Sequence, residues 1–162
     1  MSKIQDVVDL VLSRVGKNQY TQSSLRTQVF DGYSDCSSLQ WKCYEKGAGI
    51  YIGSWTGEQI TKGTMIYNNT SRATSLPSGL EPGDLVFFEG SPGGHGSGTS
   101  NHVEMYIGNG QLCGHGSGIG PTVKNANSYI SNAPSWGNYF SEVRRYVEPE
   151  PKFVSLVSWI PG

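Results

Sequence analysis

The sequence is short of charges, cysteines and long apolar runs, and each shortage excludes a class of protein. Charged residues make up 15% of the chain and the formal net charge is −1. This argues against a protein that binds nucleic acids or anionic membranes. The three cysteines contain no CxxC pair and cannot all be paired, so at least one thiol is free. No apolar run approaches the roughly 20 residues of a membrane span, and we expect neither a spanning helix nor a secretory signal.

Glycine and small polar residues take the place of the missing charges. The 162 residues include 22 glycines, which favours short strands and ordered loops over a helical bundle. This length suits a single domain, which we place at residues 1–147. Residues 148–162 begin with Glu-Pro-Glu-Pro, a stiff linker, and continue as an apolar C-terminal tail.

Local patterns predict several elements along the chain. Residues 2–15 have apolar positions on one helical face behind a Ser2–Gln5 capping pattern, and we expect a packing helix there. A short helix is expected over residues 56–61, a buried strand over 85–88 and a closing strand over 140–147. Residues 116–138 are rich in Gly, Ser and Asn and predict an irregular connection.

A cysteine stands where a loop turns into a predicted helix. The short side chain of Asp35 or Ser34 can cap the helix, which places Cys36 in its first turn, and Gly47 would end it. The free amides and the helix dipole of a first turn favour an anion, so this position favours a reactive thiolate. The alternative is that Cys36 is a small buried core residue.

Two histidines follow on a predicted hairpin whose turn is Asn109-Gly110. With a two-residue turn, opposite positions put His102 against Ser117 and His115 against Glu104. His102 and His115 would then share one face and be diagonal neighbours. In this arrangement His102 can act as the base that activates Cys36, and His115 can orient the imidazole.

Three blocks, taken in order, resemble the NlpC-type cell-wall cysteine peptidases: Ser34–Ser38, Pro82–Phe88 and Asn101–Gly110. The resemblance implies a papain-like α+β fold, with N-terminal helices packed on a central antiparallel β-sheet and the nucleophile at the start of a helix. It implies cleavage of a peptide bond in peptidoglycan stem peptides, often next to D-glutamate or a diamino acid. It also implies Cys36 as nucleophile, His102 as base and His115 as the third residue, with no cofactor and no metal.

Other residues near the thiol are candidates for binding the oxyanion or the substrate. The resemblance implies a tyrosine ahead of the cysteine, and Tyr20 and Tyr33 compete for this role. The remaining candidates are Asp35, Ser37 and, in a Gly-rich loop, Trp55. The expected partner is bacterial peptidoglycan, with a further cell-wall-binding module outside this chain. The chain also resembles the catalytic part of a phage endolysin, made in the host cytoplasm and acting on the wall after release.

Three other interpretations stay open at this point. The same triad serves an N-acetylmuramoyl-L-alanine amidase, which cleaves a different bond. A non-enzymatic wall-binding module would use the aromatic loops and would not need Cys36. A metal site would combine Cys113, His115, His95 and His102, although their spacing matches no standard zinc pattern.

Overall fold

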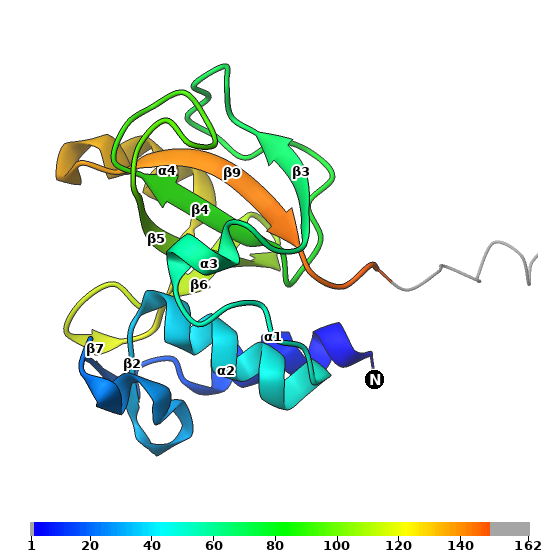
Figure 1. The fold of residues 1–162 in the computed structure, drawn as a ribbon, viewed down its shortest axis with the longest axis vertical. Coiled ribbons are helices and arrows are strands. Elements are labelled where there is room, and N and C mark those ends of the chain that lie inside the picture. Colours follow the sequence, from blue (N-terminus) through cyan, green and yellow to red (C-terminus); the bar gives the residue numbers. More distant parts are fainter. Residues whose placement is uncertain (1, 150–162) are drawn as a thin grey trace, which may run out of the picture.

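The computed structural model describes residues 2–149, which form a helical part and a sheet part (Figure 1). The helices are α1 (Lys3–Ser13), α2 (Cys36–Ala48), α3 (Thr56–Gln59) and α4 (Ala126–Asn132), with short 3-10 turns at Ser24–Thr27, Val29–Asp31 and Ala133–Trp136. The strands are β1 (Asn18–Tyr20), β2 (Tyr33–Ser34), β3 (Thr64–Asn68), β4 (Leu85–Glu89), β5 (Ser100–Gly108), β6 (Gln111–Gly114), β7 (Ile119–Gly120), β8 (Thr122–Asn125) and β9 (Tyr139–Arg145). The predicted α+β class and the central antiparallel sheet are confirmed.

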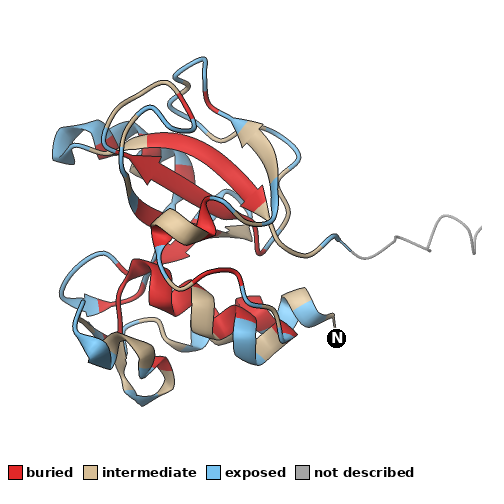
Figure 2. Ribbon diagram, in the orientation of Figure 1, coloured by how far each residue is buried: buried red, intermediate tan, exposed pale blue. Residues whose placement is uncertain are grey.

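The main sheet has six strands in the order β3-β9-β4-β5-β6-β8, and all neighbours are antiparallel. The predicted closing strand forms as β9 and lies inside the sheet between β3 and β4. A second sheet of three short strands, β2-β1-β7, stands beside the start of α2 (Figure 1). Burial is concentrated along β4 and β9 and at the start of α2 (Figure 2).

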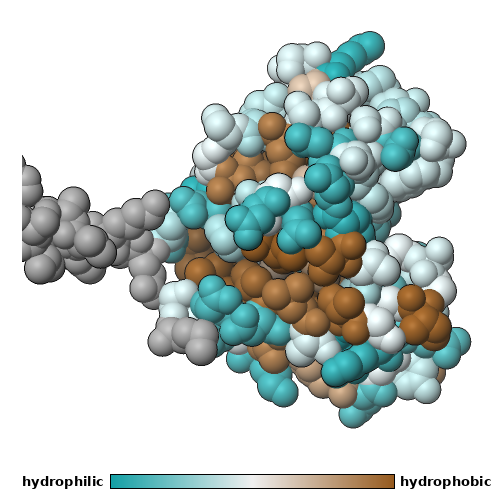
Figure 3. Space-filling model, turned by 180° about the vertical axis from the view of Figure 1, so that it is seen from behind, coloured by the Kyte–Doolittle hydropathy of each residue, from teal (hydrophilic) through white to brown (hydrophobic). Residues whose placement is uncertain are grey.

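The two faces of the main sheet are covered by different helices. One apolar cluster joins α1 and α2 to alternate residues of β4 and β5, including Phe87, Val103 and Met105. The other joins α4 to the opposite face, through Phe88 and Ile130. Seen from behind, apolar side chains form a band where the helical part meets the sheet (Figure 3).

Helix α1 forms as the sequence predicts. The Ser2 hydroxyl accepts the amide of Gln5 at 3.1 Å, and Val7, Val8 and Val11 are buried on one face. Among the described residues, no helix has the length and apolarity to span a bilayer.

Two local expectations were wrong. Gly47 does not end α2, which continues to Ala48 and is capped by Gly49 at a φ of 69°. Gly47 instead lets α1 approach, since a Cβ there would lie 2.9 Å from the backbone nitrogen of Val7. The connection over 116–138 is also not irregular throughout, because Asn125 caps α4 by accepting the amide of Ser128 at 2.9 Å.

The predicted domain of residues 1–147 lies within the described chain except for its first residue. Most of the predicted linker and tail, from residue 150 to 162, lies outside the described residues. The boundary at residue 147 stays a prediction.

Candidate active site

Cys36 is the first residue of α2, as the capping pattern predicts. Asp35 is the N-cap: its carboxylate accepts the Ser38 amide at 2.8 Å, and its own amide donates to the Ser38 hydroxyl at 2.9 Å. Arg26 donates to the same carboxylate at 2.7 Å. The capping box and this ion pair fix the first turn of α2, and with it the thiol.

His102 reaches the thiol from β5, a strand far along the chain. The Cys36 side chain lies close enough to the imidazole to raise its pKa. The ring Nε2 lies 2.5 Å from a carboxylate oxygen of Glu104 and 3.0 Å from the Tyr129 hydroxyl. The imidazole is therefore near the sulfur and held by a buried carboxylate.

The charges around His102 favour its protonated form. Burial by itself lowers the pKa of this imidazole, but the charges of Glu104 and Cys36 and the hydrogen bond that the ring donates to Glu104 together raise it to about 9. An imidazolium at neutral pH stabilises a thiolate beside it. The same site can therefore hold the thiolate–imidazolium pair that nucleophilic catalysis by cysteine requires.

Glu104 is itself held in place by two features. Lys124 of β8 donates to its second carboxylate oxygen at 2.6 Å. Burial raises the pKa of Glu104, yet the charges and hydrogen bonds of His102 and Lys124 outweigh burial and lower it. Gly114 of β6 provides the space, because a Cβ there would lie 2.5 Å from the carboxylate.

His115 does not take the place expected of it, and the reason is the register of the hairpin. The turn at Asn109-Gly110 forms as predicted, with Gly108 opposite Gln111. A bulge at Ile107 then shifts the pairing by one residue, so that Tyr106 lies opposite Leu112. A shift of one residue moves a side chain to the other face of the sheet.

The predicted pairing of His115 with Glu104 is therefore wrong, and Glu104 occupies the orienting position beside His102. His115 instead packs near the strand that leads into Cys36: its Nδ1 lies 2.7 Å from the Ser34 hydroxyl, and its ring meets Tyr20 edge-on at 5.2 Å. Its Nε2 is buried without a hydrogen-bond partner among the described residues. Burial lowers the pKa of His115 and favours a neutral ring.

The two candidate tyrosines are separated by the small sheet. Tyr20 of β1 lies opposite Ser34 of β2, and burial followed by the charge of Cys36 raises the pKa of its hydroxyl, so it is near the sulfur. Tyr33 precedes Ser34 on β2, and since side chains alternate it faces the other way. The structure brings Tyr20 to the site and not Tyr33.

Asp35 and Ser37 lie beside the thiol, but their side chains bind protein groups. The Ser37 hydroxyl donates to Asp35 at 3.2 Å and accepts from Arg26 at 3.0 Å. Arg26 thus supports the first turn of α2. A substrate contact by the side chain of Asp35 or Ser37 stays a prediction.

Trp55 is 58% exposed at the start of α3. Its neighbours attach it to both halves of the site. Arg26, which binds Asp35, also donates to the Ser54 carbonyl at 2.5 Å, and the Thr56 hydroxyl donates to the Ser100 carbonyl on β5 at 3.3 Å. The loop that carries Trp55 is therefore anchored between the cysteine helix and the histidine strand.

A cleft of about 430 Å³ opens beside His102. Tyr129 of α4 and Trp136 line it, with their rings 5.3 Å apart, and the Trp136 ring lies 6.3 Å from His102. The sequence interpretation missed Glu104, Lys124 and Tyr129 as site residues. Glu104 had a signal, because it stands two residues from His102 on one strand and therefore on the same face.

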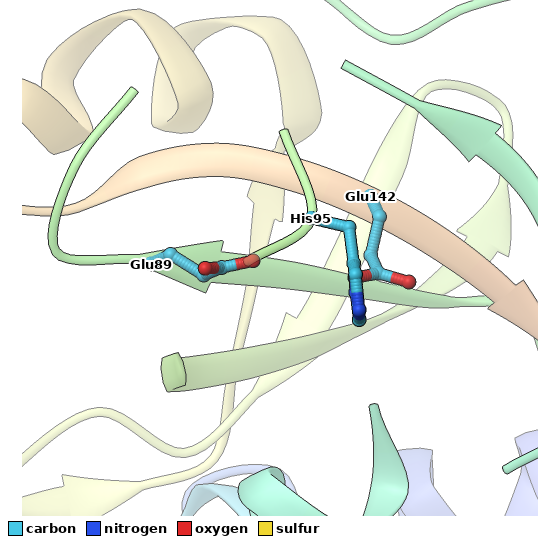
Figure 4. A group of neighbouring side chains, drawn as sticks. All are labelled: Glu89, His95 and Glu142. Atoms are coloured by element: carbon cyan, nitrogen blue, oxygen red, sulfur yellow. The ribbon is translucent and has the colours of Figure 1, made fainter. Parts of the chain in front are cut away.

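The residues of the alternative metal site do not gather together. Among the described residues, the three-ligand group that the structure forms contains His95 with Glu89 and Glu142 (Figure 4). His95 is thus separate from the thiol centre.

A helix-borne thiol facing an imidazole from an antiparallel sheet, with a third polar residue behind the imidazole, defines a papain-like fold and site. The sequence model of the NlpC/P60 family matches residues 15–145. The chain belongs to the NlpC/P60 family.

Two curated relatives are much longer than this chain. The peptidoglycan DL-endopeptidase CwlO of Bacillus licheniformis is 32% identical over 149 residues, which are 90% of this chain and 28% of that protein. The gamma-DL-glutamyl hydrolase of Bacillus subtilis is 30% identical over 114 residues, 70% of this chain and 23% of that protein. The chain thus spans about a quarter of each relative.

Solved structures share the fold. NlpC2 of Trichomonas vaginalis superposes with a TM-score of 0.66 at 22% identity, covering 91% of this chain and 47% of that one. The P60 domain of antigen MAP1204 from M. avium subspecies paratuberculosis gives a TM-score of 0.59 at 26% identity, with 91% and 96% coverage. The predicted papain-like architecture is confirmed.

Proposed function

We propose that this chain is the catalytic part of a peptidoglycan hydrolase, a cysteine endopeptidase that cuts a peptide bond in the stem peptides. The observation that carries the proposal is that Cys36, at the start of α2, lies near His102, whose Nε2 is held by Glu104. The printed activity of CwlO, peptidoglycan DL-endopeptidase, supports the choice of substrate.

The reaction would use the thiolate–imidazolium pair in two steps. The Cys36 sulfur attacks the carbonyl carbon, and the backbone amides at the start of α2 with the Tyr20 hydroxyl stabilise the oxyanion. His102 gives its proton to the leaving amine as the C–N bond breaks, which leaves an acyl-enzyme thioester. A water that loses a proton to His102 then attacks the thioester, releasing the acid and restoring the pair.

The bond we propose lies next to D-glutamate or a diamino acid. Both curated relatives have DL-peptide chemistry in their names, and one names a gamma-glutamyl bond. The printed name of the second relative favours a second candidate substrate for the same centre, a gamma-glutamyl compound other than peptidoglycan. Tyr129 and Trp136 give the cleft an apolar wall on which a ligand can pack.

Digestion of purified peptidoglycan of several stem types, followed by mass spectrometry, tests the proposal. We expect new amines within the stem peptides and none in a digest by Cys36→Ala. Lactyl-linked sugar strands freed of peptide would instead identify an amidase. Cleavage of poly-gamma-glutamate without cleavage of peptidoglycan would select the second substrate. Binding to the wall without any cleavage would refute the proposal that the chain is an enzyme.

We further propose that the chain works as a phage endolysin beside a separate wall-binding module and reaches the wall from the host cytoplasm. This proposal rests on the resemblance of the sequence to the catalytic part of a phage endolysin. Expression in a bacterial cytoplasm should leave cells intact until a pore-forming protein is induced, and then lyse them. Lysis that does not depend on the pore would contradict this route.

A further inference from the structure

Three side chains able to bind a metal lie close to one another (Figure 4). Glu89 ends β4, Glu142 lies on β9, and His95 comes from the loop over residues 90–99. One ligand atom from each lies within 4.8 Å of the other two. These atoms come from three separate segments and are brought together only by the fold.

The two carboxylates are buried, and among the described residues only Glu142 has a permanent cation, Arg144, as a partner. Glu89 is 1% exposed and Glu142 is 0% exposed. Glu142 accepts from the Arg144 guanidinium at 2.7 Å and from His95 through its other oxygen. Glu89 accepts only backbone amides among the described residues, those of Gly96 at 3.1 Å and Gly98 at 3.0 Å. A buried charge is costly without a counter-charge, so this cluster favours an added cation.

We propose that Glu89, His95 and Glu142 bind one divalent transition-metal ion, Zn²⁺ or Mn²⁺. One imidazole with two carboxylates suits these ions, whereas Mg²⁺ and Ca²⁺ prefer oxygen alone. The His95 side chain is 40% exposed, which gives the ion a path from solvent.

The surroundings of the three ligands support such a site. Arg144 fixes the orientation of Glu142, and the Asn68 side chain accepts the His95 backbone amide at 2.9 Å. Ser100 lies opposite Glu89 in the β4–β5 ladder, so the two side chains share a face, and its buried hydroxyl has no partner among the described residues. That hydroxyl is available as a further oxygen ligand.

A bound ion would fix the loop that precedes the catalytic strand. The loop over 90–99 runs directly into β5, which carries His102, and the ion would tie that loop to β4 and β9. The metal site is independent of the proposed peptidase function, because it shares no side chain with the thiol centre.

The test uses the Cys36→Ala protein, which removes the thiol that would otherwise bind the same ions. Metal-free protein is titrated with ZnCl2 and with MnCl2 by calorimetry, and its melting temperature is followed. We expect one ion per chain and a higher melting temperature with at least one of the two. Removing a residue that only hydrogen-bonds a metal ligand costs about 10- to 100-fold in metal affinity. His95→Ala removes a ligand itself, so in the Cys36→Ala protein it should lower the metal affinity by about 100-fold or more.

Thr99→Ala, at an exposed residue of the same loop, is the matched control and should bind as the parent does. The proposal is overturned if the parent binds neither ion, or if His95→Ala binds as tightly as the parent. Peptidoglycan digestion by the unmutated chain is scored separately, so a missing metal site leaves the proposed hydrolase standing, and a missing hydrolase leaves the metal site standing.

Discussion

Glu104→Gln is the substitution that most directly tests how the active site works. It keeps the size of the side chain and removes its charge. Two contacts of a fully buried group change at once, the hydrogen bond to His102 at 2.5 Å and the ion pair with Lys124 at 2.6 Å. Since glutamine cannot stabilise a buried imidazolium, the variant should lose the thiolate–imidazolium pair.

The size of the effect follows from the pKa of His102. The folded-state pKa is raised from 6.5 to about 9, and one pKa unit corresponds to about 1.4 kcal/mol, so the imidazolium is favoured by about 3 kcal/mol. This contribution to stability is present in full below pH 6.5 and is lost as the pH rises through about 9. Without the Glu104 charge, only Cys36 still opposes the effect of burial, and the pKa of His102 falls.

The assay is kcat/KM on soluble stem-peptide fragments over a range of pH. We expect a loss of about 10²- to 10⁴-fold, the range attributed to a positioned acid–base group and its orienting partner. The alkaline limb of the profile should move from about 9 toward lower pH. Removing one partner of a buried ion pair should also cost about 3–5 kcal/mol of stability, so the rates are measured where circular dichroism shows a folded protein.

His115→Gln is the matched control. This histidine bonds to Ser34 and not to His102, so the variant should keep the alkaline limb and most of the rate. The reasoning is refuted if Glu104→Gln keeps the rate and pH profile of the parent, or if His115→Gln loses as much activity and shifts the same limb.

Other changes around the centre have defined outcomes. Cys36→Ala should abolish hydrolysis in the peptidoglycan digest with little change in melting temperature, and unchanged digestion would remove Cys36 as the nucleophile. Iodoacetamide at neutral pH should label Cys36 first, because burial raises the pKa of the Cys43 and Cys113 thiols to about 12. Peptide mapping that finds Cys43 or Cys113 labelled before Cys36 would contradict this order. Gly114→Ala should push the Glu104 carboxylate aside, since its Cβ would lie 2.5 Å away, and cost about 1–3 kcal/mol of stability in urea unfolding. The double variant Gly114→Ala/Glu104→Gln should have the same kcat/KM as Glu104→Gln alone, because both changes act through the Glu104 carboxylate. Losses that add would show that Gly114 affects the rate through another contact.

The sequence by itself determined the local features of this protein, those set by residues next to one another in the chain. Asp35 caps α2 and places Cys36 in the first turn because a helix start needs a short acceptor for its free amides. Asn109 and Gly110 form the hairpin turn, with φ angles of 54° and 69°, because these residues tolerate the left-handed conformation. The order of the three sequence blocks likewise predicted the family and the papain-like fold.

Only the tertiary structure decided which residue stands behind His102. The bulge at Ile107 shifts the hairpin register by one residue, and a local pattern does not specify such a shift, because the packing of both sheet faces selects it. Lys124 and Tyr129 reach Glu104 and His102 from segments that the sequence left as an irregular connection. The grouping of Glu89, His95 and Glu142 was hidden for the same reason, since strand order sets which distant side chains become neighbours.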